Sequence, residues 1–447
     1  MTKKISIGVT GFSRSGKTVF IGSLIQALLT SDAWSERKGQ GPLARFSPVE
    51  RGQFISAQVK SDLNTDLPQF PFRKVRESLV GSSSKWPTAT EGISRIVVEV
   101  EFSPRKSFIK RPRKMQIELI DFPGEWLIDL PMLDLSYEEW SRNMLAAAEC
   151  GARKEWVLKY FDHVDAIGIG AAFDEEVAED LADLWREYLQ VSIDSGYVLN
   201  QPGRLLRPDA LRNSPILRLV PLPERLAGSG LWVGMEARFK DYKSKVIKPF
   251  YKKHFSKIDR QIVLIDLLRA IQLGEPVFNE MTESLSETLK SFNYGKGGGL
   301  SWLVGGATSH VLFAATKCDH VTRGDRANIE QTMRRMLSHL DDQNELRASS
   351  LKHEVMAISS IKVTEDRKTT KPPVREVLFG LPKGAAQPNQ YDPGGVPLDF
   401  PPHWGEVDFE FYEFQPMHEL MTDALYEGFP AINLGRVLEF LIGDDFA

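Results

Sequence analysis

The chain has 447 residues and a formal net charge of -4, with 42% hydrophobic and 26% charged residues. This balance is that of a globular protein with a full hydrophobic core and roughly two to three domains. The small net charge excludes a general electrostatic affinity for nucleic acid or anionic membranes. Two cysteines, Cys150 and Cys318, exclude a disulfide framework and a cysteine-based zinc site. We therefore expect a protein of the reducing cytoplasm.

The first expected elements are a buried strand over residues 5–10, a loop over residues 11–18, and a helix after Lys17 whose apolar residues repeat from Phe20 to Leu29. The loop has the pattern of a phosphate-binding P-loop. It consists of Gly11, Phe12, Ser13, Arg14, Ser15, Gly16, Lys17 and Thr18, with Val19 following it. A plain glycine turn with an exposed lysine is the alternative, and it fits a strand-to-helix junction less well.

The residue types of this loop suit a nucleoside triphosphate bound with Mg²⁺. Gly11 and Gly16 allow a tight backbone whose N–H groups point at phosphate oxygens, and the helix N-terminus adds a favourable dipole. Lys17 would contact the β- and γ-phosphates, and the Thr18 hydroxyl would ligate Mg²⁺. Arg14 is a candidate for an arginine that acts on the transferred phosphate in cis.

Two further strands are expected over residues 96–102 and 115–120, after an irregular stretch over residues 35–92. They form a hairpin whose second strand leads into Asp121-Phe-Pro-Gly124. The Asp121 carboxylate would hold Mg²⁺ through water, and the Gly124 N–H would approach the γ-phosphate. The alternative is a common Asp-x-x-Gly turn.

Glu125 stands where many small GTPases carry a glutamine that orients the attacking water. A carboxylate there repels the γ-phosphate unless it is neutralised, so we expect slow or differently assisted hydrolysis. An exposed acidic residue with no role is the alternative. In the preceding loop, Thr90 is the preferred candidate for a switch threonine that ligates Mg²⁺, with Thr88 as the other candidate and a plain loop residue as the alternative.

Helical periodicity without strands predicts a mostly helical insertion over residues 137–258. Its segment 236–257 mixes eight basic residues with aromatic ones. Such a segment either packs an aromatic stripe on the core or binds anionic lipid, RNA or an acidic partner. We expect the first of these, and no specific nucleic acid as a partner.

Strands return at residues 261–266, 310–315 and 354–358, with helices between them. This alternation predicts an α/β fold with a mainly parallel, doubly wound sheet. The uncharged run Gly297–Thr316 contains too many polar residues and glycines for a transmembrane helix, and we expect none. A loop is expected over residues 380–404 and a helical tail over 416–443.

Thr316-Lys317-Cys-Asp319 follows the second of these strands and predicts a guanine-reading site. Both Asp319 oxygens would accept from guanine N1–H and the N2 amine, a match that adenine lacks. Lys317 would lay its aliphatic stem on the base. Thr316 replaces the usual asparagine, which leaves an ATP site open. Backbone N–H groups of the next loop would contact the guanine carbonyl; the candidates are Ser359, Ser360 and Ile361.

The ordered motifs GFSRSGKT, DFPGEW and TKCD make the chain similar to the YcjX family of bacterial P-loop NTPases. The stretches QPGRLLRPDALRNSPILRLVPLP, IDRQIVLIDLL and INLGRVLEFLIGD carry the resemblance along the whole chain. It implies a Ras-like GTPase core, binding of guanine nucleotide, and an association with bacterial stress responses of the phage-shock kind. Residues 1–136 and 259–379 would form the two parts of the core, and 380–447 would pack on it.

By this resemblance, Lys17 and Thr18 hold phosphates and Mg²⁺, Asp121 and Gly124 sense the γ-phosphate, and Asp319 reads guanine. Three hypotheses remain open. The first is a GTP-hydrolysing switch that cycles between GTP and GDP, the second an ATPase on the same fold. The third is a scaffold or membrane-associated adaptor that binds nucleotide without turnover. For all three, the protein partner is unknown, with a membrane-associated stress protein as the candidate. The chain itself is expected in the cytoplasm or at the periphery of the inner membrane.

Overall fold

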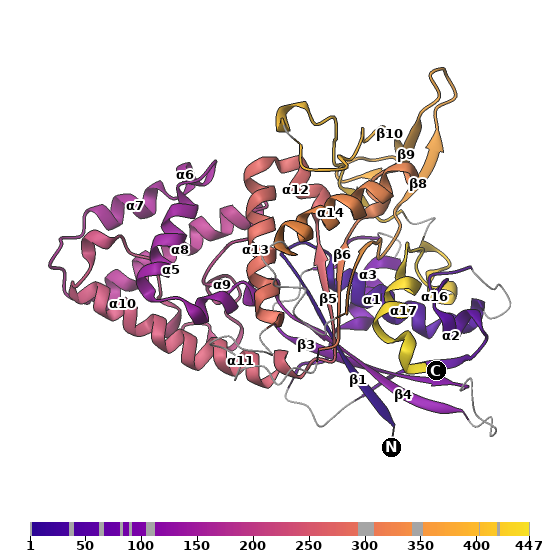
Figure 1. The fold of residues 1–447 in the computed structure, drawn as a ribbon, viewed down its shortest axis with the longest axis horizontal. Helices are drawn as coiled ribbons and strands as arrows, with labels where there is room; N and C mark the ends of the chain where they lie inside the picture. Colours follow the sequence, from indigo (N-terminus) through magenta and orange to yellow (C-terminus); the bar gives the residue numbers. More distant parts are fainter. Residues whose placement is uncertain are drawn as a thin grey trace. The chain divides into compact units, whose positions relative to one another are not determined.

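A computed structural model describes the chain except for residues 1, 35–39, 62–66, 81–83, 89–91, 104–111, 294–307, 342–351, 402, 418–420 and 447, and the side chains of 288–293 and 339–341. The chain divides into two compact units (Figure 1). The first, called the sheet unit, comprises Met1–Phe122, Ile258–Gln272 and Thr308–Ala447. The second, called the helical unit, comprises Pro123–Lys257 and Leu273–Ala307.

A seven-stranded sheet with the order β2-β3-β4-β1-β5-β6-β7 organises the sheet unit. The strands are β1 (Lys3–Gly11), β2 (Phe54–Lys60), β3 (Ser94–Phe102), β4 (Arg113–Asp121), β5 (Arg260–Ile265), β6 (His310–Ala315) and β7 (Lys352–Ala357). Five neighbouring strands, in the order β4-β1-β5-β6-β7, pair in parallel. β3 pairs antiparallel with both of its neighbours, β2 and β4. The expected α/β fold with a mainly parallel sheet is confirmed. β2 corrects the expectation that residues 35–92 are irregular.

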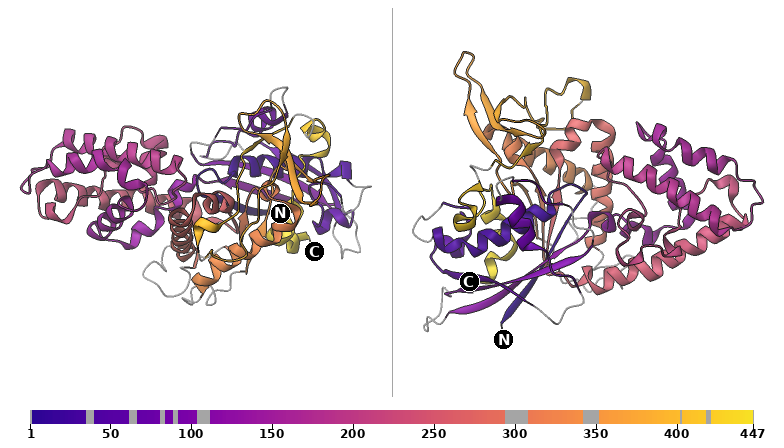
Figure 2. Two further views of the ribbon diagram at one scale, coloured as in Figure 1. Left: turned by 90° about the horizontal axis from the view of Figure 1, so that it is seen from above. Right: turned by 180° about the vertical axis from the view of Figure 1, so that it is seen from behind.

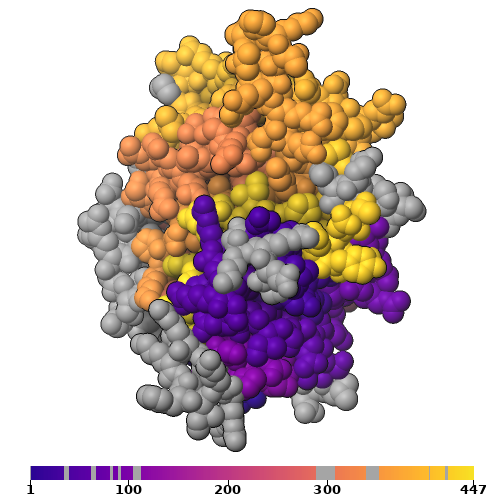
Figure 3. All heavy atoms as spheres, turned by 90° about the vertical axis from the view of Figure 1, so that its right-hand side faces the viewer, coloured from indigo at the N-terminus to yellow at the C-terminus, as the bar shows by residue number. Residues whose placement is uncertain are grey.

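Helices cover this sheet through a continuous apolar core. Phe20 and Leu24 of α1 are fully buried against Ile7 of β1 and Ile117 of β4. The helices of the unit are α1 (Lys17–Leu29), η1 (Ser31–Trp34), α2 (Ser47–Glu50), α3 (Phe72–Val80), α12 (Leu267–Leu273), η8 (Cys318–His320), η9 (Arg323–Asp325), α14 (Arg326–Asp341), η10 (Trp404–Glu406), α16 (Ala424–Glu427), α17 (Leu434–Ile442) and η11 (Gly443–Phe446). The C-terminal segment lies beside the N-terminal part of the unit, because Gln26 of α1 donates to the Ala424 carbonyl at 3.0 Å (Figures 2 and 3).

A second, antiparallel sheet occupies part of the tail. It contains β8 (Thr364–Lys368), β9 (Glu376–Pro382), β10 (Asn389–Tyr391) and β11 (Phe414–Gln415). The expectation of a loop over residues 380–404 is therefore wrong for the residues in β9 and β10. β8 is polar and mostly exposed, so it lacks the apolar alternation by which strands are found in a sequence.

The helical unit contains no strand within its described residues. Its elements are α4 (Gly124–Leu127), η2 (Leu130–Asp134), α5 (Tyr137–Ala148), α6 (Arg153–Trp156), α7 (Leu158–Asp165), α8 (Glu175–Asp194), α9 (Gly203–Leu206), η3 (Asp209–Leu211), η4 (Pro215–Leu217), η5 (Glu224–Leu226), α10 (Gly230–Asp241), η6 (Tyr242–Ile247), α11 (Lys248–Lys253), η7 (Phe255–Lys257) and α13 (Glu275–Asn293). Ser136 and Glu139 form a capping box that fixes the start of α5. Trp140, Tyr160 and Trp185 are fully buried and fill the core.

The basic aromatic segment forms one run of helix, with α10 and α11 joined by a π-helical turn, η6. Phe239, Tyr242 and Phe250 are buried, whereas Lys240 and Lys252 are exposed. The aromatic side chains of the segment therefore pack in the core and most of its lysines face solvent, as the sequence predicts. No helix among the residues that the structure describes is both long and apolar enough to cross a membrane.

Candidate functional site

The loop between β1 and α1 has the backbone that a phosphate cradle needs. Gly11 and Gly16 adopt positive φ angles of 148° and 88°. A Cβ atom at Gly11 would lie 2.3 Å from the Leu264 carbonyl oxygen, so the neighbouring strand leaves room for glycine alone. Nothing lies within 4 Å of a Cβ at Gly16, so the left-handed backbone by itself favours glycine there.

The side chains of this loop differ in exposure. Lys17 Nζ donates to the carbonyls of Gly11 (2.7 Å) and Phe12 (3.1 Å), which places its ammonium group over the loop. Ser15 is fully buried, and its Oγ has no hydrogen-bond partner in the described part of the chain. Arg14 is exposed, with a φ of 63°. The remaining loop residues Ser13, Thr18 and Val19 are half-buried.

Asp121 ends β4 at the level of this loop. It is 2% exposed and stands opposite Val9 in the parallel pairing of β4 with β1. The N–H of Phe122 donates to the Val9 carbonyl at 3.1 Å, which fixes the strand end. The Thr18 hydroxyl and the Asp121 carboxylate are oxygen ligands of the kind that Mg²⁺ prefers, so these residues fit the ion. Thr90 lies outside the described residues, and Thr88 is exposed.

The predicted guanine-reading loop follows β6. Thr316 is buried and its hydroxyl donates to the Ile265 carbonyl at 3.2 Å. Lys317 adopts a left-handed φ of 62°, and its ammonium group forms an ion pair with Asp266. The structure thus fixes both residues from the end of the neighbouring strand β5.

Asp319 is 1% exposed and only partly satisfied. Its Oδ2 accepts from the Val363 N–H at 2.8 Å, whereas Oδ1 has no hydrogen-bond partner within the described ranges. The predicted contact with guanine uses both oxygens, and one of them is engaged by the backbone in this conformation. For Asp319 to contact guanine through both oxygens, its Oδ2 must either lose the hydrogen bond from the Val363 N–H or accept from guanine as well.

The loop after β7 contributes less than expected. The Ser359 N–H donates to the Ile432 carbonyl at 3.1 Å, so in this arrangement it does not serve a base. The Ser360 carbonyl accepts from the Ser23 hydroxyl of α1, and Ile361 is buried. This loop therefore contacts α1. The contact of Ser359, Ser360 and Ile361 with guanine stays a prediction.

Three buried polar atoms without partners in the described chain mark one edge of the sheet. They belong to Ser15 after β1, Asp266 after β5 and Asp319 after β6. Buried polar groups are nearly always hydrogen-bonded in folded proteins, so such atoms need an explanation. These strands are parallel neighbours, and ligands of doubly wound sheets bind at their carboxyl ends. A bound nucleotide would satisfy such atoms, because its phosphate oxygens accept from a hydroxyl and its N–H and O–H groups donate to carboxylates.

Gly124 and Glu125 belong to the helical unit, where they begin α4. Glu125 is 7% exposed, and its carboxylate lies 3.7 Å from Arg207 Nε. The alternative of an exposed acidic residue is therefore wrong. Sequence reasoning missed Arg207, because it lies far along the chain from Glu125 and no motif spacing links the two. Its place in the stretch QPGRLLRPDALRNSPILRLVPLP, which carries part of the family resemblance, was the one available signal.

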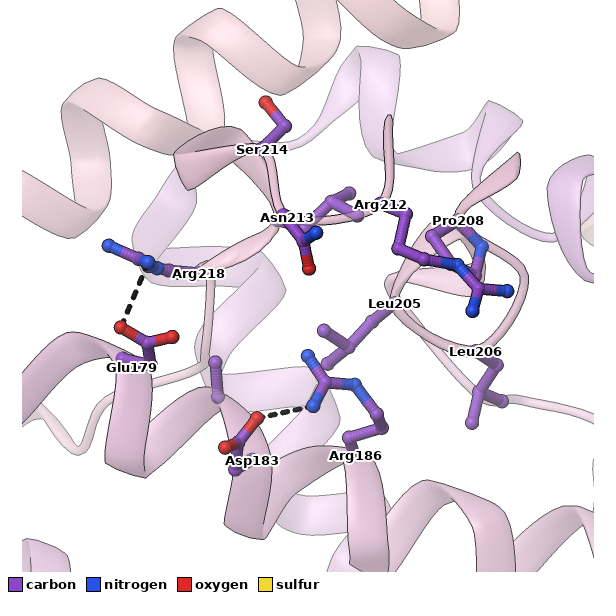
Figure 4. A pocket seen from close by; sticks show the side chains of 12 residues that line it. Glu179, Asp183, Arg186, Leu205, Leu206, Pro208, Arg212, Asn213, Ser214 and Arg218 are labelled. Atoms are coloured by element: carbon purple, nitrogen blue, oxygen red, sulfur yellow. Dashed lines mark hydrogen bonds and ion pairs between the residues drawn. The ribbon is translucent and has the colours of Figure 1, made fainter. Parts of the chain in front are cut away.

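The helical unit also contains a cavity of about 610 Å³ beside α8 and the 205–218 segment (Figure 4). Three arginines line it, but Arg186 pairs with Asp183, and Arg218 pairs with Glu179 at 2.9 Å. Carboxylates of the same cavity thus compensate two of its guanidinium groups. The cavity lacks the glycine-rich backbone of the β1–α1 loop, and it is not the candidate phosphate site.

Known proteins resemble this chain along nearly its whole length. The sequence pattern of the YcjX-like family, DUF463, matches residues 5–446. The chain belongs to the YcjX-like family. Two relatives are each named "Ras-like GTPase YcjX", one from Shewanella oneidensis and one from Escherichia coli. Each is 31% identical to this chain over 99% of the chain's length, covering 94% and 96% of the relatives. The YcjX resemblance expected from the motifs is confirmed.

Proposed function

We propose that the protein binds GTP with Mg²⁺ and hydrolyses it slowly to GDP and inorganic phosphate. The observation that carries the proposal is the β1–α1 loop, with its two left-handed glycines and the Lys17 ammonium group. The unpartnered buried atoms after β1, β5 and β6, among the described residues, support a ligand at the same edge. The names of the two relatives, which call them GTPases, support guanine as the base.

Each group of the site has a task in this reaction. Amides of the loop and Lys17 would neutralise the phosphates, while Thr18 and Asp121 would position Mg²⁺. A water oxygen attacks the γ-phosphorus, and the bond from that phosphorus to the bridging oxygen breaks. The electron pair of that bond stays on GDP, and the protons of the water pass to phosphate and solvent. Glu125 in place of glutamine supports a low rate.

A second candidate, an ATPase, is supported by two observations. Thr316 replaces the asparagine usual in guanine sites, and the Val363 N–H already occupies one oxygen of Asp319. Competition of GTP and ATP for one fluorescent nucleotide separates the candidates. Preference for GTP supports the GTPase, and preference for ATP contradicts it.

The role as a stress-related switch, with a membrane-associated stress protein as partner, is the part of the proposal that rests on the resemblance of the motifs. Its test is retention of such a partner by the GTP-bound and GDP-bound protein. Equal retention in both states contradicts a switch.

Lys17→Ala tests the nucleotide site directly. Removing the ammonium group from the phosphates should weaken GTP binding on the order of 100-fold, or about 2–3 kcal/mol. Titration calorimetry with Mg²⁺ measures it. Lys74→Ala, which removes an exposed lysine of α3 in the same unit, is the matched control and should bind GTP as the wild type does. Equal affinity of Lys17→Ala and the control would refute the site.

A further inference from the structure

The peptide after the Asp121 motif is held tightly inside the helical unit. All four residues of α4, Gly124–Leu127, are buried. α4 packs on α9, which starts at Gly203 and is followed by Arg207. Glu125 thus lies on a buried helical turn, in a fixed environment, rather than on an open loop.

Gly203 sets how closely the two segments approach. A Cβ atom at this position would lie 1.7 Å from the Glu125 carbonyl oxygen, so only glycine fits. The Gly203 N–H donates to Asp129 Oδ1 at 2.8 Å, and Asp129 Oδ2 accepts from the Tyr242 hydroxyl at 2.6 Å. The backbone beside Glu125 is therefore anchored by a buried hydrogen-bond network.

Two arginines of the same segment hold Trp126, the residue after Glu125. The Arg204 guanidinium carbon lies 3.1 Å from the centre of the Trp126 ring, which also packs edge-on against Phe250 at 5.6 Å. The Trp126 indole N–H donates to the Arg207 carbonyl at 3.1 Å. The segment Gly203–Arg207 thus fixes both Glu125 and Trp126.

The charge of Glu125 is compensated by this segment. Its side chain is 8% exposed, and Arg207 Nε lies 3.7 Å from Oε1. A carboxylate this well buried is costly without a counter-charge. Arg207 is 31% exposed, so it can offer its charge to Glu125 while its own guanidinium group keeps access to water.

We propose that Arg207 is the positioning residue of Glu125, which it neutralises and orients for GTP hydrolysis. The inference rests on the proposed function. Glu125 follows the Mg²⁺-holding Asp121 by four positions in the sequence, where a bare carboxylate repels the γ-phosphate. Paired with Arg207, the carboxylate keeps its capacity to accept a hydrogen bond from water while its charge is offset.

A double-mutant cycle on GTP turnover tests this proposal. Arg207→Ala should lower kcat about 10-fold with little change in KM, because the uncompensated carboxylate opposes the transition state. In a Glu125→Gln background the same substitution should change kcat less than about 2-fold, since glutamine carries no charge to offset. Arg207→Lys should restore part of the wild-type rate. Thermal unfolding of each variant shows whether it is folded.

Arg212→Ala is the matched control, because it removes an exposed arginine five residues after Arg207 and should leave kcat unchanged. An equal loss from Arg207→Ala in both backgrounds would show that the two side chains act independently and would overturn the inference alone. Wild-type protein that binds GTP but never turns it over would overturn this inference together with the proposed hydrolysis. Failure to bind GTP at all would remove the proposed function itself.

Discussion

Glu280 and Asp129 of the helical unit are hydrogen-bonded on both carboxylate oxygens, whereas Asp266 and Asp319 of the sheet unit are hydrogen-bonded on one within the described chain. In the helical unit, Glu280 forms an ion pair with Arg153 and accepts from the N–H groups of Val198 (2.7 Å) and Leu199 (2.8 Å). Asp129 has a donor on each oxygen. These carboxyl groups are held entirely by the protein, as structural groups are.

In the sheet unit, Asp266 and Asp319 each keep one oxygen without a hydrogen-bond partner among the described residues. Both follow neighbouring parallel strands. Under the proposed function, the contrast separates carboxylates that stabilise the fold from carboxylates that would bind a ligand. Removing or neutralising one carboxylate of each kind, and comparing the effects on stability and on nucleotide binding, tests this difference.

The largest effect is expected for Glu280→Ala. It leaves Arg153, which is 1% exposed, without its counter-charge, and should cost about 3–5 kcal/mol of unfolding free energy. GTP affinity of the folded variant should stay that of the wild type. Denaturant unfolding measures the loss, with Glu283→Ala, an exposed glutamate of the same helix, as the control. If Glu280→Ala loses no more unfolding free energy than Glu283→Ala, Glu280 does not stabilise the fold and the contrast between the two units is wrong.

A pH-dependent effect is expected at Asp129. Burial raises its pKa from 3.8 to about 7, against the lowering effect of the Tyr242 hydroxyl, the Gly203 N–H and Arg204. The folded chain therefore binds a proton that the unfolded chain has released, so unfolding free energy falls as pH rises from about 4 to about 7. The full pKa shift of Asp129 corresponds to at most about 4 kcal/mol of unfolding free energy. Asp129→Asn should flatten this slope in unfolding curves taken across that range, and an unchanged slope would contradict the assignment.

The smallest effect on stability, and a large one on binding, is expected for Asp319→Asn. GTP affinity should fall on the order of 100-fold, because the amide mismatches the guanine N2 amine. Xanthosine triphosphate, which carries a carbonyl at that position, should regain affinity. Unfolding free energy should change by less than about 1 kcal/mol. Nucleotide titrations measure this, with the exposed Asp399→Asn as control; unchanged GTP preference would show that Asp319 does not read the base.

The sequence was most informative where a function is built from consecutive residues. The P-loop spans eight positions, and its glycines have the backbone that the motif predicts. The mainly parallel sheet followed from buried apolar strands. β8 was missed because it is polar and mostly exposed. β2 was missed because it is a partly buried edge strand within a stretch that is otherwise rich in polar residues and prolines.

Contacts between distant segments could not be read from the sequence. The engagement of Asp319 by Val363 depends on how two loops meet after β6 and β7. The pairing of Glu125 with Arg207 depends on a turn that reaches back across the helical unit. Gly203 was visible as a glycine beside a proline, but its reason, a close approach to another backbone, exists only in the folded chain.

The π-helical turn Tyr242–Ile247 has a consequence for how this segment tolerates length changes. Such a turn accommodates one extra residue, and one residue rotates a helix by about 100°. Deleting a single amino acid there would turn Phe250 away from Trp126 while Tyr242 kept its place. The extra residue of the π-helical turn thus sets the rotation of α11 about the helix axis relative to α10.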